Sequence, residues 1–246
     1  MEKLRQKLDG LLSQLEDEKE VRKRLDTLLS VYPFNQFEYL ISILLGKGIL
    51  SLEAYYEIRD EYIARNKYRP LFELSPRPFG EAWAEGYLRK LVPELVEPSK
   101  KLDPGYSGQY DFFMDGKIRI EVKASRAVHS AANKPLSVKA ASSKSHEAFQ
   151  MIFEQIKCRC CDVFVWIGVW QDVIRHWVLS SNEVKSSKYY SRRQHLGNKG
   201  EGQLHLNKKN ISEFAKYEVN GSDLLEAIRA AHSRQLRAKA AKKGNS

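Results

Sequence analysis

Two acidic residues and a lysine on neighbouring predicted strands form the combination in this sequence best suited to chemistry. The stretch 109–123 reads QYDFFMDGKIRIEVK and carries Asp111, Glu121 and Lys123. Mg²⁺ prefers oxygen ligands, and proteins usually hold it with one or two carboxylates plus water and phosphate oxygens. A lysine beside such an ion could orient or deprotonate a water and stabilise the added charge of a phosphodiester transition state. The three residues therefore predict metal-dependent phosphodiester hydrolysis.

A hairpin would bring these residues together. Asp115-Gly116 between two β-rich runs is a strong hairpin signal, and each run carries an alternating apolar set. These sets are Tyr110, Phe112 and Met114 in the first strand, and Ile118, Ile120 and Val122 in the second. Both sets face one core only if residue 112 lies opposite residue 118 or 120, which requires a three-residue loop such as 114–116 with glycine in the left-handed conformation. A two-residue loop would place Asp111 beside Ile120, on the wrong face.

A third carboxylate is expected from the helix predicted over 79–92, where Glu81 and Glu85 are four residues apart and share a face. The ordinary explanation for any one of these charges is a surface ion pair across a hairpin, because an acidic-x-Lys triplet is common on strands. The upstream Asp, the spare helix carboxylates and the acid-free basic stretch that follows favour a site instead.

At these residues the sequence resembles the PD-(D/E)xK nuclease superfamily, which has the restriction-endonuclease-like fold. The resemblance spans roughly residues 79–180, and the Pro that usually precedes the Asp is Tyr110 here. It implies that Asp111 and Glu121 bind Mg²⁺, that Lys123 is catalytic, and that Glu85, or else Glu81, completes the site.

Within that superfamily, a compact chain with helical and basic additions is similar to type II restriction endonucleases. This similarity implies double-stranded DNA as substrate, a homodimer that cuts a palindrome, and a cognate DNA methyltransferase as functional counterpart. Two alternatives remain: a repair, recombination or phage nuclease on the same fold, and a non-catalytic basic DNA-binding protein.

Positive charge is concentrated along the chain. The sequence has 41 Lys and Arg against 31 Asp and Glu, a net charge of +10, which indicates a polyanionic partner, nucleic acid ahead of a membrane surface. Three blocks without Asp or Glu, 122–146, 184–200 and 227–246, hold sixteen of the basic residues. The last is expected to be a basic helical tail that adds salt-dependent affinity. The residues expected to contact DNA are Arg126, Asn133, Lys134, Lys139, Lys144, Tyr190, Arg192, Arg193, Gln194, His195, Asn198 and Lys199.

The predicted fold class is α/β (α+β), with a restriction-endonuclease-like core whose central mixed sheet has a helix on either side. The expected elements after residue 78 are helices at 79–92, 145–158 and 222–243 and strands at 94–97, 109–114, 117–124, 162–169 and 173–179. The helix at 145–158 would carry Gln150, Gln155 and Lys157 either near the metal or on a solvated face. The expected regions are a helical N-terminal region at 1–75, a catalytic core at 76–185 and a basic DNA-contacting region at 186–246, together forming one compact unit.

Compartment and cysteine usage complete the expectations. No apolar run is long enough to span a bilayer, and residues 1–6 lack a signal-peptide core, so we expect a cytoplasmic protein. Cys158, Cys160 and Cys161 are too clustered for a disulfide framework, and they lack a second ligand pair for zinc, so reduced thiols are expected.

Overall fold

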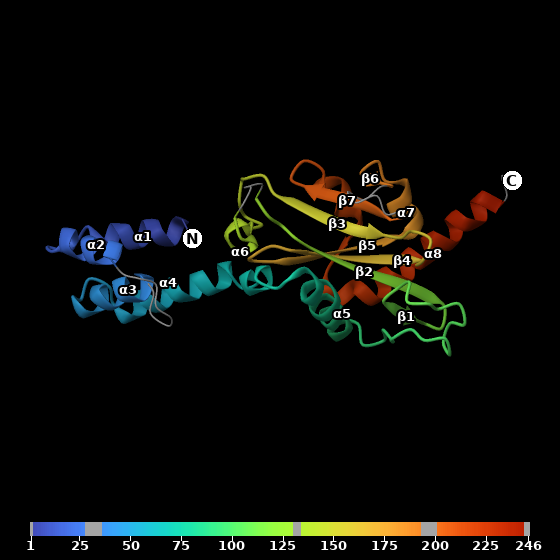
Figure 1. Cartoon of the computed structure of the whole chain (residues 1–246), viewed down its shortest axis with the longest axis horizontal. Coiled ribbons are helices and arrows are strands. Elements are labelled where there is room, and N and C mark those ends of the chain that lie inside the picture. Colours follow the sequence, from blue (N-terminus) through green and yellow to red (C-terminus); the bar gives the residue numbers. More distant parts are fainter. Residues whose placement is uncertain (1, 28–35, 130–133, 193–200, 244–246) are drawn as a thin grey trace. The chain divides into compact units, whose positions relative to one another are not determined.

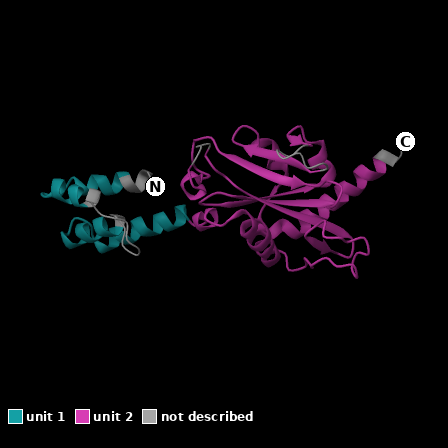
Figure 2. Ribbon diagram, viewed as in Figure 1, with its two compact units in different colours: residues 1–66 teal, residues 67–246 magenta. Residues whose placement is uncertain are grey.

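Residues 2–27, 36–129, 134–192 and 201–243 are described by a computed structural model, in which the chain divides after Asn66 (Figure 2). The first unit contains α1 (Glu2–Leu12), α2 (Glu18–Thr27), α3 (Gln36–Gly46) and α4 (Leu52–Arg65). Its buried side chains are mostly leucines, including Leu12 and Leu44. The helical N-terminal region thus ends earlier than the expected boundary at residue 75.

The hairpin in the second unit has the predicted register. β1 (Phe112–Met114) runs antiparallel to β2 (Ile118–Arg126), with Phe112 opposite Ile120. Asp115 and Gly116 both have positive φ, 51° and 65°, and Lys117 N–H bonds to the Met114 carbonyl at 3.1 Å. The three-residue loop is therefore 115–117, one residue later than expected. Phe112 and Met114 share a core with the apolar set of β2, which fixes Asp111 on the side of Glu121. The expectation for Tyr110 is wrong, because it is buried in the other core, where its hydroxyl donates to Asp103 at 2.8 Å.

The hairpin belongs to a mixed five-stranded sheet with the order β1-β2-β4-β5-β8 (Figure 1). β4 (Val163–Val169) is parallel to β2, β5 (Ile174–Ser180) is antiparallel to β4, and β8 (Glu218–Val219) forms the far edge. Every residue of β4 is buried, as expected for a strand covered on both faces. The mixed α/β class is confirmed; the strand expected at 94–97 is reduced to a single bridge between Val96 and Phe113.

One face of this sheet is covered by helices. These are the π-helical segment η2 (Pro78–Ala84), α5 (Glu85–Leu91) and α8 (Leu224–Lys243), whose buried residues Phe79, Leu88 and Ile228 share a core with Ile120 and Val165. The helices predicted at 79–92 and 222–243 are thus confirmed. They lie on the same side of the sheet.

The other face is covered by a second sheet, so the prediction of a helix on that side is wrong. β3 (Gln150–Ile156), β7 (Gly202–Asn207) and β6 (Tyr190–Ser191) form this sheet in the order β3-β7-β6 (Figure 1). The remaining short elements are η1 (Arg69–Phe72), α6 (Leu136–Lys139), α7 (Ser181–Ser186), η3 (Ile211–Tyr217) and η4 (Gly221–Asp223).

A β-bulge explains why 145–158 resembles a helix in sequence. Met151 and Phe153 are buried at strand spacing, but Gln155 has a φ of 54° and the pairing register shifts between Phe153 and Ile156. The extra residue places Ile156 three positions after Phe153, which is a helical interval.

The C-terminal region, 186–246, is part of the second unit, in which β7 is the central strand of the second sheet. None of the helices in the described ranges is long and apolar enough to cross a membrane. Cys158, Cys160 and Cys161 are free thiols, as expected, and burial raises the pKa of Cys161.

Candidate active site

Asp111 is attached to the backbone of the second strand of the hairpin. Its own N–H bonds to the Ile120 carbonyl at 3.0 Å, and its carboxylate Oδ2 accepts a 2.7 Å hydrogen bond from the N–H of Val122. Val122 lies between Glu121 and Lys123 in the sequence. The Asp111 carboxylate is therefore held beside the two positions that the sequence pattern paired with it.

Glu121 and Lys123 project from the same face of β2, the face covered by the second sheet. Lys123 Nζ lies 2.7 Å from Glu121 Oε1, and the two side chains are 18% and 11% exposed. Their neighbours on β4 are the fully buried Phe164 and Trp166. This ion pair is thus largely screened from water by aromatic packing, unlike a surface pair.

The charges of Asp111 and Glu121 also act on Glu85, which lies on α5. Burial raises the pKa of Glu85 to about 7, and the neighbouring Asp111, Glu81 and Glu121 add to the shift. Burial also raises the pKa values of Asp111 and Glu121, although the Val122 N–H opposes the shift at Asp111 and Lys123 opposes it at both. The cluster has more acids than bases, so added positive charge would stabilise its ionised form.

The two helix glutamates differ in their surroundings. Glu85 is half-buried and lies close enough to Asp111 and Glu121 for their charges to raise its pKa. Glu81 is exposed and forms a 2.7 Å ion pair with Arg77, although its charge still raises the pKa of Asp111. Glu85 is therefore the better placed of the two to join the acidic cluster.

The donor atoms of this cluster fit Mg²⁺ by their chemistry. No group of three Asp, Glu, His or Cys side chains in the described ranges converges closely enough to hold a metal ion unaided. Mg²⁺ needs only one or two protein carboxylates, because water and phosphate oxygens fill its other positions. Asp111 and Glu121, with Glu85 nearby, supply hard oxygen donors and an excess of negative charge.

The residues expected to contact DNA differ in their exposure to solvent. Lys134, Lys144 and Arg192 are exposed, and Lys139 is half-exposed. The expected contacts that lie outside the described residues are Asn133, Arg193, Gln194, His195, Asn198 and Lys199.

Arg126 is buried, contrary to its expected role at the DNA surface. Its Nη2 donates to the Leu74 carbonyl at 2.6 Å, and its guanidinium lies 3.9 Å from the centroid of the Phe79 ring. Burial lowers its pKa. This arginine connects β2 to the segment that carries Glu85, so its role in this conformation is structural.

Tyr190 is partly buried on β6, the edge strand of the second sheet. Its hydroxyl is 3.5 Å from the Ile156 carbonyl, and its ring lies so close to Gly202 that a Cβ there would fall 2.3 Å from a ring atom. A glycine at residue 202 is what permits this approach. The ring of Tyr190 is thus partly occupied by contacts within the second sheet.

Lys157, expected on a helix, instead follows the last residue of β3. It forms a 3.1 Å ion pair with Glu201, and its charge lowers the pKa of Glu121. Gln150 bonds to His205 across the second sheet, and Gln155 occupies the bulge. Of these three residues, Lys157 is the one with an electrostatic link to the acidic cluster.

The third basic block is docked on the core through ion pairs. Arg229 pairs with Asp115 at 2.9 Å, Arg234 with Glu183 at 2.8 Å and Lys239 with Asp162 at 2.8 Å. α8 also packs apolar side chains under the first sheet. The expected basic tail is therefore largely a structural helix.

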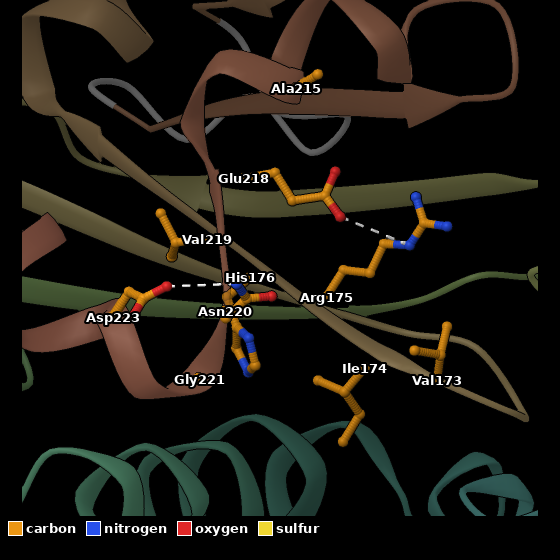
Figure 3. A pocket seen from close by; sticks show the side chains of 10 residues that line it. All are labelled: Val173, Ile174, Arg175, His176, Ala215, Glu218, Val219, Asn220, Gly221 and Asp223. Atoms are coloured by element: carbon orange, nitrogen blue, oxygen red, sulfur yellow. Dashed lines mark hydrogen bonds and ion pairs between the residues drawn. The ribbon is translucent and has the colours of Figure 1, made fainter.

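A pocket of about 660 Å³ lies elsewhere, at the β5–β8 edge of the first sheet (Figure 3). Arg175 points toward Glu218 across it at 3.7 Å, and Asn220 bonds to Asp223 at its rim. β4 separates β5 from β2, so the pocket is distinct from the acidic cluster.

No known family model matches the chain, and no curated protein matches it either. Any function of the chain is therefore inferred from its own residues.

Proposed function

We propose that this chain is a Mg²⁺-dependent type II restriction endonuclease with a restriction-endonuclease-like core, which hydrolyses both strands of double-stranded DNA at a short specific sequence. The hydrogen bond from Val122 N–H to Asp111 carries the proposal, since it holds that carboxylate beside Glu121 and Lys123. The excess of basic residues over acidic ones supports a polyanionic substrate.

Each residue of the cluster has a role in this proposal. Asp111 and Glu121 would hold the metal, with Glu85 as a supporting carboxylate. Bound Mg²⁺ would supply an activated water and offset charge on the scissile phosphate. Lys123 would orient the attacking water, and its ammonium would stabilise the negative charge that develops on the phosphate oxygens.

The remaining parts of the proposal concern partners and place. A homodimer would present one site to each strand of a palindrome. A cognate DNA methyltransferase would protect the cell's own recognition sites, and the enzyme would act in the cytoplasm, where it meets DNA.

Cleavage of plasmid DNA tests the proposal. We expect wild-type protein with Mg²⁺ to give discrete fragments, and EDTA or Lys123→Ala to abolish them. Lys117→Ala is the matched control, because Lys117 lies exposed in the turn of the same hairpin and should leave cleavage unchanged. DNA binding without cleavage in both Mg²⁺ and Mn²⁺ would contradict catalysis, whereas a ladder of random products would favour a repair, recombination or phage nuclease.

A further inference from the structure

A short helical turn holds apolar side chains at the surface between two lysines. Residues 134–139 have the sequence KPLSVK and are called the 134–139 tip below. Val138 is 57% exposed and Leu136 is 39% exposed, and Pro135 between Lys134 and Leu136 is exposed as well. Single exposed apolar residues are ordinary on protein surfaces, but three within four residues form a projecting apolar edge.

The base of the 134–139 tip is firmly attached. The N–H groups of Val138 and Lys139 bond to the Pro135 carbonyl at 3.1 and 3.2 Å, which closes the turn. The Lys139 carbonyl accepts a 2.8 Å bond from His129 N–H, and Ala140 pairs with Val128. The apolar side chains therefore project from a turn that is hydrogen-bonded to the residues just after β2.

The 134–139 tip is within reach of any duplex bound at the acidic cluster. His129, which bonds to Lys139, is six residues after Lys123, and six extended residues span at most about 20 Å. That length corresponds to about six steps of a DNA strand at ~3.4 Å each. A phosphate at Lys123 and the bases at the tip would thus belong to the same short stretch of DNA.

We infer that the 134–139 tip is a wedge that deforms duplex DNA, with Leu136 and Val138 inserted at a base step and Lys134 and Lys139 on the flanking phosphates. The inference rests on the proposed function, because it requires a duplex at the acidic cluster. Charge selects DNA over a protein partner: no Asp or Glu occurs between residues 122 and 146, and aliphatic wedges flanked by cations are how proteins unstack base steps.

DNA unwinding measures such insertion without knowledge of the recognition sequence. Closed circular plasmid is relaxed by a metal-independent topoisomerase in Ca²⁺ with increasing amounts of the full-length protein, then stripped of protein and resolved into topoisomers. We expect wild type to lower the linking number in proportion to the protein bound. Leu136→Ser with Val138→Ser should lose most of this change, while affinity falls no more than about tenfold because phosphate contacts supply most of it.

Two controls separate insertion from general damage. Leu236→Ser removes a leucine on α8 that is 50% exposed, and it should unwind like wild type. Lys134→Ala with Lys139→Ala should reduce the salt slope of binding, which is the slope of the log binding constant against log salt concentration, by about 2 in magnitude. The unwinding per bound molecule should be retained.

Several outcomes would overturn the wedge. If wild type cleaves DNA without unwinding it, the wedge is refuted and the proposed nuclease function is supported. Unwinding that persists in the double serine variant also refutes the wedge. If that variant unwinds DNA like wild type but has a different oligomeric state in light scattering, the tip makes protein contacts instead. Wild type that neither binds nor cleaves plasmid refutes the proposed function as well.

Discussion

The Asp111 carboxylate accepts a 2.7 Å hydrogen bond from the backbone N–H of Val122, the residue between Glu121 and Lys123. A strand N–H in this position would otherwise be available to a neighbouring strand, so Asp111 replaces a backbone partner with a side chain. The acidic group thereby acquires the rigidity of the sheet, which is the preorganisation that a metal-dependent site requires.

Asp111→Asn should abolish catalysis without unfolding the protein. The amide oxygen can still accept the Val122 N–H, so we expect the melting temperature to change little. Loss of the negative charge should lower the cleavage rate by about 100-fold or more, as when a group that stabilises the transition state is removed. Asp115→Asn is the matched control, because it neutralises a carboxylate in the same hairpin turn. An Asn variant that retains a tenth of wild-type activity would remove Asp111 from the proposed site.

The acidic cluster should make stability in EDTA depend on pH. Glu85 has a pKa raised to about 7 by burial, and the pKa values of Asp111 and Glu121 are also raised. The folded state then binds these protons more tightly than the unfolded chain. For Glu85 and Glu121, whose pKa values are both raised to about 7, the contribution is complete below about pH 4.5 and is lost as pH rises through 7. One pKa unit corresponds to about 1.4 kcal/mol, so the melting temperature should change by a few degrees.

Comparison with Glu85→Gln isolates this effect. His176 and His232 have pKa values lowered by burial, and they act in the opposite direction because their contribution is lost as pH falls. Both histidines remain in the variant, so the difference in melting temperature between wild type and Glu85→Gln between pH 5 and 8 reports Glu85. Mg²⁺ should stabilise wild type more at pH 8 than at pH 5.5, since protons compete for the carboxylates. Equal stabilisation at both values would argue against a metal at this cluster.

Local signals made the hairpin predictable. Asp115-Gly116 specifies the turn, and alternation in the two strands fixes the register, so the positions of Asp111, Glu121 and Lys123 follow from some fifteen consecutive residues. The alternation of Gly202, Leu204 and Leu206, all buried in β7, carries the same kind of signal and could have identified that strand.

Contacts between distant residues were beyond the reach of these patterns. The bulge at Gln155 changes the apparent period of β3, and it is supported by pairing with β7, some fifty residues later. Arg126 is buried because Leu74 and Phe79 receive its guanidinium, and a strand pattern alone assigns an arginine to the surface. The sequence of the 227–246 block likewise gives no indication that Asp115, Glu183 and Asp162 pair with three of its cations in the fold.

Arg126→Ala should reduce stability and leave DNA binding electrostatics intact. The substitution removes a bond to the Leu74 carbonyl and the packing on Phe79, which together should cost about 2–3 kcal/mol. Arg126→Met keeps the aliphatic packing and should cost less. Urea denaturation measures both variants, and gel shifts at several salt concentrations should give the wild-type salt slope. A slope reduced by about 1 at unchanged stability would instead place Arg126 on a phosphate.

Variants of two arginines on α8 should distinguish residues that stabilise the fold from residues that contact DNA. Arg234 pairs with Glu183, and its Nη2 also donates to the Val178 carbonyl at 3.2 Å. Glu183 in turn caps α7. Because the pair is partly exposed, Arg234→Ala should cost only about 1–2 kcal/mol in urea denaturation. Arg237 is exposed, so Arg237→Ala should leave stability within about 0.5 kcal/mol. If α8 faces DNA, the Arg237 variant alone should reduce the salt slope of binding, by about 1. A reduced slope in Arg234→Ala with full stability would mean that α8 is held by its apolar face and that its cations are available to phosphate.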